Sequence, residues 1–399
     1  MAETERITPD MGFVRELKAL GGDAVKKCYQ CAACGAACPL APAESPFPRK
    51  EMLWAQWGLR ARLLGDIDLW LCHNCQTCSA VCPRGARPAD VLAAARTAVY
   101  RDLVGPAWLG RRLRSPGFLP LLFAFPALLF LVIGAVTTGL RLPEGRIVFD
   151  KLYPGDTVID PLFVLTALWV VLTLALGVKK LWAQFAASVP VTLVIGEHKP
   201  KPHVAASLAA VVFGEIVSHA KWVACAAADR RKFLGHRALF YGVIALAAVT
   251  SLLALGHWGG RLVPFLAPLG GTPMPLGSPV KLLANAGAVA MLYGLTALTR
   301  HRVTTDTATS CSSYEDWLLL GLLWAVAVTG LGAEIFRLFG LAALAYSTYF
   351  LHLVAVWVLV ATLPWSKFGH LVYRTTALVY ARQAGRLPVP PREQTVLRL

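Results

Sequence analysis

Eight cysteines near the start of the chain form two copies of one pattern, C-x2-C-x2-C-x3-C followed by proline. The second copy begins 44 residues after the first. The two copies are Cys28, Cys31, Cys34, Cys38 and Cys72, Cys75, Cys78, Cys82. Thiolates at this spacing are typical ligands of 4Fe–4S clusters, which carry single electrons. The pattern therefore predicts two clusters and electron transfer.

The fourth cysteine of each copy is expected to bind the other cluster, as it does in two-cluster proteins with this spacing. The predicted ligands of cluster 1 are Cys28, Cys31, Cys34 and Cys82. The predicted ligands of cluster 2 are Cys72, Cys75, Cys78 and Cys38. Each cluster would then draw on both copies, so the two copies must fold as one unit.

Disulfide bonds and zinc are the alternative uses of such cysteines. The first residues, MAETERITPD, have neither the basic nor the apolar region of a signal peptide, so an oxidising compartment is not expected. Zinc sites usually show two separated C-x2-C pairs, without a third cysteine three residues on. Both alternatives fit the pattern less well than iron–sulfur clusters do.

The composition predicts a membrane protein with a small polar domain at its start. Of 399 residues, 56% are hydrophobic and 16% are charged, and the mean hydropathy is +0.55. Soluble domains carry about 25% charged residues. The net charge of +16 comes from basic clusters between apolar stretches, which favours an anionic membrane surface over nucleic acid. We expect a cluster domain at 1–105, a membrane domain at 106–380 and a cytoplasmic tail at 381–399.

The elements that must position the cysteines are predicted to be helices, so the expected fold is all-α. A helix is expected to start at Pro48 and to run through RKEMLWAQWGLRARLL. PADVLAAARTAVYRDL, after the second copy, is rich in good helix formers and is followed by Gly105 and Pro106. The cluster domain is therefore expected to be helical and ferredoxin-like.

Six stretches are long and apolar enough to span a bilayer as helices. They lie at 118–140, 161–178, 236–256, 280–299, 317–336 and 342–366. The main basic clusters fall on one side of these spans, which places both termini in the cytoplasm by the positive-inside rule. The segments 181–196 and 204–228 are expected to be interfacial or bundle-packed helices on the cytoplasmic side.

Four histidines at the ends of predicted spans are candidate haem ligands. His352 and His370 are 18 residues apart on the last span, which is five helical turns or about 27 Å. In an antiparallel bundle, His236 would meet the level of His370 and form an inner haem b site. His257 would meet His352 at an outer haem b site. Such residues are usually functional within membranes, although a histidine at a helix end can also be a cap.

Other ionisable residues are weaker candidates. His219 is a reserve haem ligand, and His73 is expected to line a cluster. Lys281 and Glu334 lie at the non-cytoplasmic ends of two spans, where a quinol could release protons. The alternative for this pair is that both side chains simply extend to the membrane interface.

The chain resembles two families joined together. KKCYQCAACGAACP and DLWLCHNCQTCSAVCPRGARP resemble the C subunit of heterodisulfide reductase, and FLHLVAVWVLVATLPWSKFGHLVYR resembles the cytochrome b subunit of respiratory nitrate reductase. Such a fusion resembles the QmoC family, the membrane subunits of quinone-interacting oxidoreductases. In the cytochrome family, the partner histidines lie ten residues apart on one helix, where this chain has Tyr241 and Ser251.

This resemblance implies a function and a set of partners. Menaquinol would be oxidised in a bacterial inner membrane, and electrons would pass through haem b and the two clusters. QmoA-like and QmoB-like flavoproteins would receive the electrons, with adenylylsulfate reductase as the final acceptor. The alternatives are a heterodisulfide-reductase-like membrane subunit and a membrane tether without haem. Because the sequence contains no phosphate-binding loop and no pairing of nucleophile and base, no covalent catalysis is expected.

Overall fold

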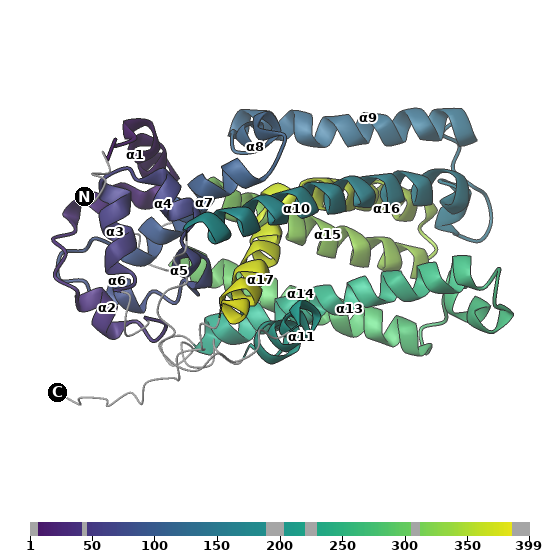
Figure 1. The fold of residues 1–399 in the computed structure, drawn as a ribbon. Helices are drawn as coiled ribbons and strands as arrows, with labels where there is room; N and C mark the ends of the chain where they lie inside the picture. Colours follow the sequence, from purple (N-terminus) through teal and green to yellow (C-terminus); the bar gives the residue numbers. More distant parts are fainter. Residues whose placement is uncertain (1–6, 42–45, 189–202, 220–229, 305–311, 385–399) are drawn as a thin grey trace.

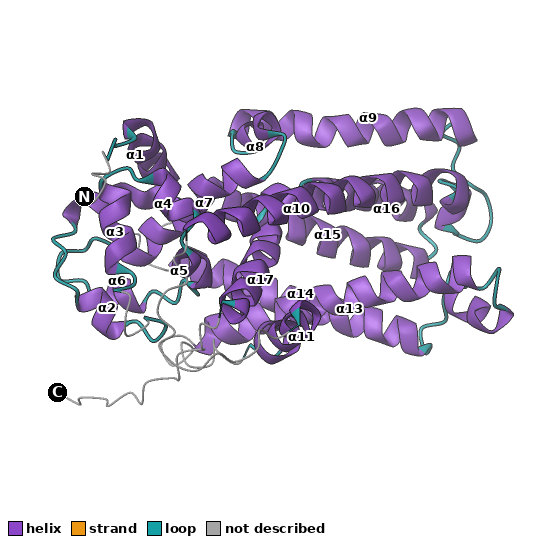
Figure 2. Cartoon of the chain, viewed as in Figure 1, coloured by secondary structure: helices purple, strands orange, loops and turns teal. Residues whose placement is uncertain are grey.

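The computed structural model describes residues 7–41, 46–188, 203–219, 230–304 and 312–384. Within these residues every regular element is a helix, as Figure 2 shows, and the expected all-α class is confirmed. The cluster domain lies at one end of the molecule, and the long helices extend away from it (Figure 1). The arrangement separates a compact polar head from an apolar bundle.

Seven α-helices surround the cysteines in the described part of the cluster domain, and α7 packs against most of the others. The helices are α1 (Met11–Leu17), α2 (Ala33–Ala37), α3 (Arg49–Gln56), α4 (Arg60–Leu64), α5 (Ile67–Leu71), α6 (Thr77–Ala80) and α7 (Pro88–Leu103). The prediction of α7 is confirmed from its proline start to its last residue. Most of its side chains are buried, so α7 is the axis of this domain's core.

The single helix predicted after Pro48 is wrong, because the structure has two short helices there. Gly58 separates α3 from α4 and adopts a φ of +68°, a left-handed conformation that glycine tolerates best. A Cβ at this position would also lie 2.5 Å from the carbonyl oxygen of Asp10. The turn therefore depends on glycine and lets α1 pack against α3.

Six helices of the described residues are long and apolar enough to cross a membrane, so the number of predicted spans is confirmed. Their helical cores are α9 (Leu119–Thr138), α10 (Asp160–Ser188), α13 (Arg230–Ala254), α14 (Pro279–Thr304), α15 (Tyr314–Leu338) and α16 (Ala342–Ala361). Short helix α8 (Ala107–Arg112) connects them to the cluster domain. The outward faces of the six helices carry exposed leucine, valine and phenylalanine side chains, which suits a lipid environment.

Helices α13 and α14 pack closely because glycines replace larger side chains at their contact. A Cβ on Gly294 of α14 would lie 2.5 Å from the backbone nitrogen of Leu239 and 2.6 Å from the carbonyl oxygen of Gly235. Gly242 of α13 faces the α14 backbone in the same way, since a Cβ added to it would lie 2.8 Å from the carbonyl oxygen of Gly287. Small residues at such a contact let two membrane helices approach closely.

The substitution Gly294→Val is expected to lower the stability of the purified protein by about 1–3 kcal/mol, because the added side chain forces the two backbones apart. The measurement is thermal unfolding in detergent. Gly321→Val is the matched control, since a Cβ on Gly321 meets no atom within 4 Å and the same valine enters a helix. Equal losses in the two variants would contradict this account of the α13–α14 contact.

The prediction that His352 and His370 share one helix is wrong. Helix α16 ends at Ala361, a 3₁₀ turn with Pro364 follows, and α17 (Lys367–Gln383) starts anew. The side chain of Ser366 accepts a hydrogen bond from the Phe368 amide and caps the new helix. Helix α17 turns across the base of the bundle (Figure 1), so the two histidines lie on different elements.

Helix α17 joins the two domains into a continuous core. It packs against α5 of the cluster domain and against α10 and α11 (Val204–Val211) of the membrane domain. Buried residues of one hydrophobic cluster come from both sides, including Trp70 and Tyr373. One hydrophobic core therefore continues across the boundary predicted near residue 105.

The segment expected to form interfacial helices has two outcomes in the described residues. Residues 181–188 continue α10, so the separate helix predicted there is wrong over this stretch. Residues 204–217 form α11 and a further helical turn, which packs on α17 as a bundle-packed helix. Residues 189–202 and 220–229 lie outside the described part, as does most of the predicted tail, 385–399.

Candidate electron-transfer site

The two cysteine loops have the same backbone conformation. In the first loop, Gln30 and Ala32 have φ values of 59° and 69°, and in the second loop Asn74 and Gln76 have values of 53° and 68°. These residues hold equivalent places after Cys28 and Cys72. Alternation into the left-handed region turns successive backbone N–H groups inward, which forms the concave nest found at iron–sulfur sites. Two equal nests suit two equal clusters.

The predicted ligands of cluster 1 lie together. The thiols of these four residues line one small cavity of about 20 Å³, in which Arg49 and Arg84 also take part. They are Cys28, Cys31, Cys34 and Cys82. Three of them come from the first sequence copy and one comes from the second.

The predicted ligands of cluster 2 also lie together, around Cys38. The pKa of Cys38 is raised to about 12, mainly by burial and to a smaller extent by the nearby Cys72 and Cys75. Burial also raises the pKa of Cys78, with the same neighbours contributing. Cys38 therefore faces the cysteines of the second copy, and the donor set fits the crossed arrangement. Thiols with raised pKa values must lose their protons when metal binds.

Hydrogen bonds reach several of the sulfur atoms. The backbone amide of Asn74 donates to Cys72 Sγ at 3.4 Å, and the amide of Ala86 donates to Cys82 Sγ at 3.3 Å. The Gln30 side chain donates to Cys28 Sγ at 3.5 Å. Donors of this kind stabilise the reduced, more negative form of a cluster and raise its potential.

The two cysteine sets differ in exposure, which indicates which set lies nearer the surface of the head. In the first set Cys31 is exposed, and in the second set Cys38, Cys72 and Cys78 are all buried. Cys72 directly follows α5, which packs against α17 at the base of the bundle. The second set therefore lies next to the membrane helices, and the first set lies nearer the surface of the head.

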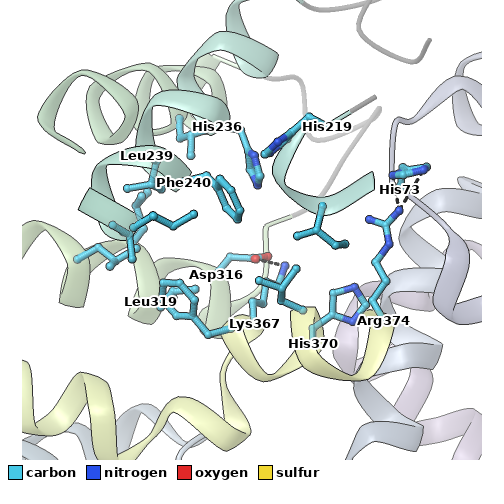
Figure 3. Close-up of a pocket in the computed structure, with 18 of the residues that line it drawn as sticks. His73, His219, His236, Leu239, Phe240, Asp316, Leu319, Lys367, His370 and Arg374 are labelled. Atoms are coloured by element: carbon cyan, nitrogen blue, oxygen red, sulfur yellow. Dashed lines mark hydrogen bonds and ion pairs between the residues drawn. The ribbon is translucent and has the colours of Figure 1, made fainter. Parts of the chain in front are cut away.

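A cavity of about 460 Å³ lies beside the second cysteine set, where the head meets the bundle. Its size falls in the range of cofactor and ligand sites. Apolar side chains of α13, α15 and α17 form most of its wall. Figure 3 shows the imidazoles and charged side chains that face it, namely His73, His219, His236, His370, Asp316, Lys367 and Arg374.

The inner pair of predicted haem ligands faces this cavity from opposite walls. His236 of α13 lies beside His219, with ring centroids 5.6 Å apart, and His370 of α17 lies across the cavity (Figure 3). The His370 ring stacks on Trp70 of α5, at 6.0 Å between centroids and an interplanar angle of 23°. Burial lowers the pKa of His370 well below its ordinary value, and nearby arginines add to the effect. Its imidazole is therefore neutral, the form that binds metals.

Charged side chains close the cavity on the side of the head. Arg374 Nη2 donates a hydrogen bond to His73 Nδ1 at 2.5 Å, and His73 directly follows the cluster-2 residue Cys72. Lys367 pairs with Asp316, and Arg302 lies 3.4 Å from the same carboxylate. The cavity is thus connected to the second cysteine loop through Arg374 and through the stacked rings of His370 and Trp70.

The outer pair of predicted haem ligands has separate partners. His257 is half exposed and pairs with Asp156, which also binds Arg261. His352 Nδ1 lies 3.0 Å from Thr329 Oγ1, and its ring approaches α15 where Gly330 has no side chain. Each ring is thus held by its own neighbours.

Two family comparisons match separate parts of the chain. Residues 24–86 match a 4Fe–4S dicluster domain. Residues 126–390, about two thirds of the chain, match the family described as citrate utilization protein B. The chain belongs to the citrate utilization protein B family. The first match covers all eight motif cysteines, and the second covers the cavity histidines of α13 and α17.

Two curated relatives are similar to the head of this family member. They are the C subunits of the H(2):CoB-CoM heterodisulfide,ferredoxin reductases of Methanothermobacter marburgensis and Methanothermobacter thermautotrophicus. Each is 34% identical over 100 residues, which is 25% of this chain and 54% of the relative. The chain therefore spans about half the length of these relatives. No solved structure matches the chain.

These findings establish an iron–sulfur electron-transfer protein with membrane-spanning helices, whose head resembles the C subunit of heterodisulfide reductase. The QmoC resemblance is confirmed only at this level. The sequence motifs did not predict the citrate utilization protein B match over the membrane domain.

Sequence reasoning missed the residues that connect the cavity to the second cysteine loop. Trp70 and Arg374 are 304 residues apart on different helices, and nothing in the pattern of either helix marks them. The sequence predicts that His73 lines a cluster, because it directly follows Cys72, but gives no sign of its contact with Arg374. Lys281 and Glu334 pair with each other, 2.7 Å apart, at the far ends of α14 and α15.

Proposed function

We propose that this protein transfers electrons between membrane quinone and a cytoplasmic oxidoreductase through haem b and two 4Fe–4S clusters. The observation that carries the proposal is the cavity beside the second cysteine loop. Histidines of two separate elements, His236 and His370, face each other across it. Buried ionisable groups at the ends of membrane-spanning helices are costly and usually functional.

The residues around the cavity fit a haem b. Two imidazoles from facing helices would be the axial ligands, with His219 adjacent to His236. Leucine and phenylalanine side chains suit the porphyrin faces, and Arg302, Lys367 and Arg374 suit the propionate carboxylates. Bound there, haem b would supply one-electron chemistry.

The chain's own residues then provide the connection towards the clusters. Trp70 stacks on His370 and lies two residues before Cys72, while Arg374 binds His73 directly after it. Arg96 donates to the Cys72 carbonyl oxygen at 2.7 Å and holds this loop in place. The exposure of Cys31 makes the first cysteine set the side from which a partner is reached.

We propose one haem per chain, at the inner site, because His257, the expected partner of His352, is half exposed and pairs with Asp156 instead. A pyridine haemochrome assay of the purified protein, related to protein concentration, is expected to give about one haem b. The His352→Ala variant should keep this value, because His352 has no partner histidine in this proposal once His257 pairs with Asp156. A value of two in the unmodified protein, falling to one in the variant, would restore the outer site that the sequence predicted.

The direction of electron flow and the partners are also part of the proposal. The QmoC resemblance favours menaquinol as donor, QmoA-like and QmoB-like flavoproteins as partners and adenylylsulfate reductase as final acceptor. The family description, citrate utilization protein B, favours a partner of organic-acid metabolism instead. The same sites can carry electrons either way, and the potentials of quinone and partner set the direction. We propose that the head and both termini lie in the cytoplasm of a bacterium, as the basic clusters indicate.

Lys281 and Glu334 remain the proposed proton-releasing pair of a quinol site at the opposite end of the bundle. Both side chains are largely buried, with exposed fractions of 17% and 15%, and their ion pair links α14 to α15. Purification with bound partners, followed by quantification of iron, haem and flavin, tests the whole assembly. About eight irons without haem would leave the membrane tether as the function.

A further inference from the structure

The surface above the first cysteine set is basic and exposed. Cys31 is exposed, and Tyr29 beside it has an exposed fraction of 69%. The exposed cations around them are Lys26, Lys27, Arg49 and Arg84. We call these four residues with Tyr29 the basic rim. Arg49 and Arg84 line the cavity of the first cysteine set itself, so the positive charge lies directly over it.

The basic rim has a fixed geometry at its centre. The guanidinium of Arg84 lies 4.2 Å from the centroid of the Tyr29 ring and donates to the Tyr29 hydroxyl at 3.0 Å. The contact joins the two cysteine copies, because Tyr29 follows Cys28 and Arg84 follows Cys82 by two residues. Tyrosine and arginine are enriched in protein interfaces, and tyrosine is ordered there at small entropic cost.

Exposed acidic side chains are absent from the described segments around the basic rim, and Glu51, which follows Lys50, is buried and pairs with it. Positions 24–41, 46–50 and 81–88 include no aspartate and no glutamate. Asp23, just outside, binds Arg87 at 2.6 Å and so does not face the rim as an isolated charge. The cations of the basic rim therefore create a local positive field at this surface.

We propose that the basic rim is the docking surface for a protein electron carrier whose contact face is rich in carboxylates. The inference rests on the proposed function only in taking cluster 1 as the outer redox site. Complementary charge speeds the encounter of such partners and orients them, and transient redox complexes use small interfaces. One electron would pass from a reduced cluster to the carrier. The cluster would be oxidised by one electron, and the carrier would be reduced by one electron.

Cytochrome c and its succinylated form are matched probes for this test. They share one haem, but the native protein is basic, and succinylation converts its lysines to carboxylates. The full-length protein in detergent, as isolated, should bind the succinylated form at 10 mM ionic strength and not the native form. Binding should weaken sharply at 150 mM, where the screening length falls from about 30 Å to about 8 Å. Because both partners are oxidised, this readout is independent of electron transfer.

The variant Lys27→Glu/Arg84→Glu is expected to weaken binding of the succinylated probe about tenfold or more at low salt. The control Arg15→Glu/Arg111→Glu has the same net charge and changes exposed residues of α1 and α8, away from α2 and α6 in Figure 1. It should keep the affinity within about twofold. The rate of electron transfer from dithionite-reduced protein to the same probe should fall in parallel.

Equal losses in the rim variant and the control would overturn the docking surface, as would equal binding of both probes. Iron content of both variants shows whether the head is intact, and a conservative Lys27→Gln/Arg84→Gln variant covers the case in which charge reversal unfolds it. A protein without haem that still shows the rim effect would defeat the proposed function and leave this inference standing.

Discussion

Replacing His370 by alanine is expected to remove haem b from the purified protein while leaving about eight irons per chain. His370 supplies a neutral, buried imidazole that stacks on Trp70 and faces His236 across the cavity. Losing even a group that supports a metal ligand costs 10–100-fold in affinity. We therefore expect the haem content of His370→Ala to fall below about a tenth of the unmodified value.

The control for this prediction is His73→Ala, which changes another histidine that lines the same cavity. His73 binds Arg374 rather than facing His236, so its loss should leave the haem content near normal. The reduced-minus-oxidised absorption spectrum and iron quantification give both values. Unchanged haem in His370→Ala would show that the ligand lies elsewhere, and loss of haem together with iron would indicate a general folding defect.

Replacing Cys38 by alanine is expected to remove cluster 2 and not cluster 1, although Cys38 belongs to the first sequence copy. The reason is its position beside Cys72 and Cys75, whose charges contribute to its raised pKa. Iron should fall from about eight to about four atoms per chain. The electron paramagnetic resonance signal of the dithionite-reduced protein should lose the coupling between two clusters.

Double variants distinguish the crossed arrangement from the simple one. Cys38→Ala/Cys75→Ala changes two ligands of one proposed cluster, so about four irons should remain. Cys31→Ala/Cys38→Ala changes one ligand of each cluster, so nearly all iron should be lost. The reverse outcome, with four irons in the second variant and none in the first, would assign Cys38 to its own sequence copy.

Much of the fold follows from local sequence signals. Pro88 at the first position of α7 and the good helix formers behind it predicted that helix from end to end. The six apolar stretches predicted the spans because length and apolarity alone decide whether a helix can cross a bilayer. The crossed cysteine sets stay a prediction, in which spacing gives the first three ligands and the chemistry of two-cluster proteins gives the fourth.

The turn between α16 and α17 was predictable only in part. Pro364 and the capping Ser366 are helix-stopping and helix-starting signals, but the apolar residues on both sides suggested one continuous span. The five-turn spacing of His352 and His370 reinforced that interpretation. In the structure the spacing has no geometric meaning, since the two rings belong to different helices.

The cavity could not be derived from the sequence, because it depends on how distant elements pack. His219, His236 and His370 come from three elements, and only the placement of α17 against α5 brings them to one space. Trp70 and Arg374 acquire their roles from the same packing. Their importance follows from contacts rather than from any pattern that a single helix could show.

The most direct test of the central proposal is reduction of the haem by quinol in the full-length protein. Oxidised protein in lipid nanodiscs is mixed with menadiol under anaerobic conditions, and the haem b spectrum is followed. The account predicts that the reduced spectrum develops in the unmodified protein and is absent from His370→Ala. A preparation with about eight irons that shows no haem b spectrum, even after dithionite, would contradict it.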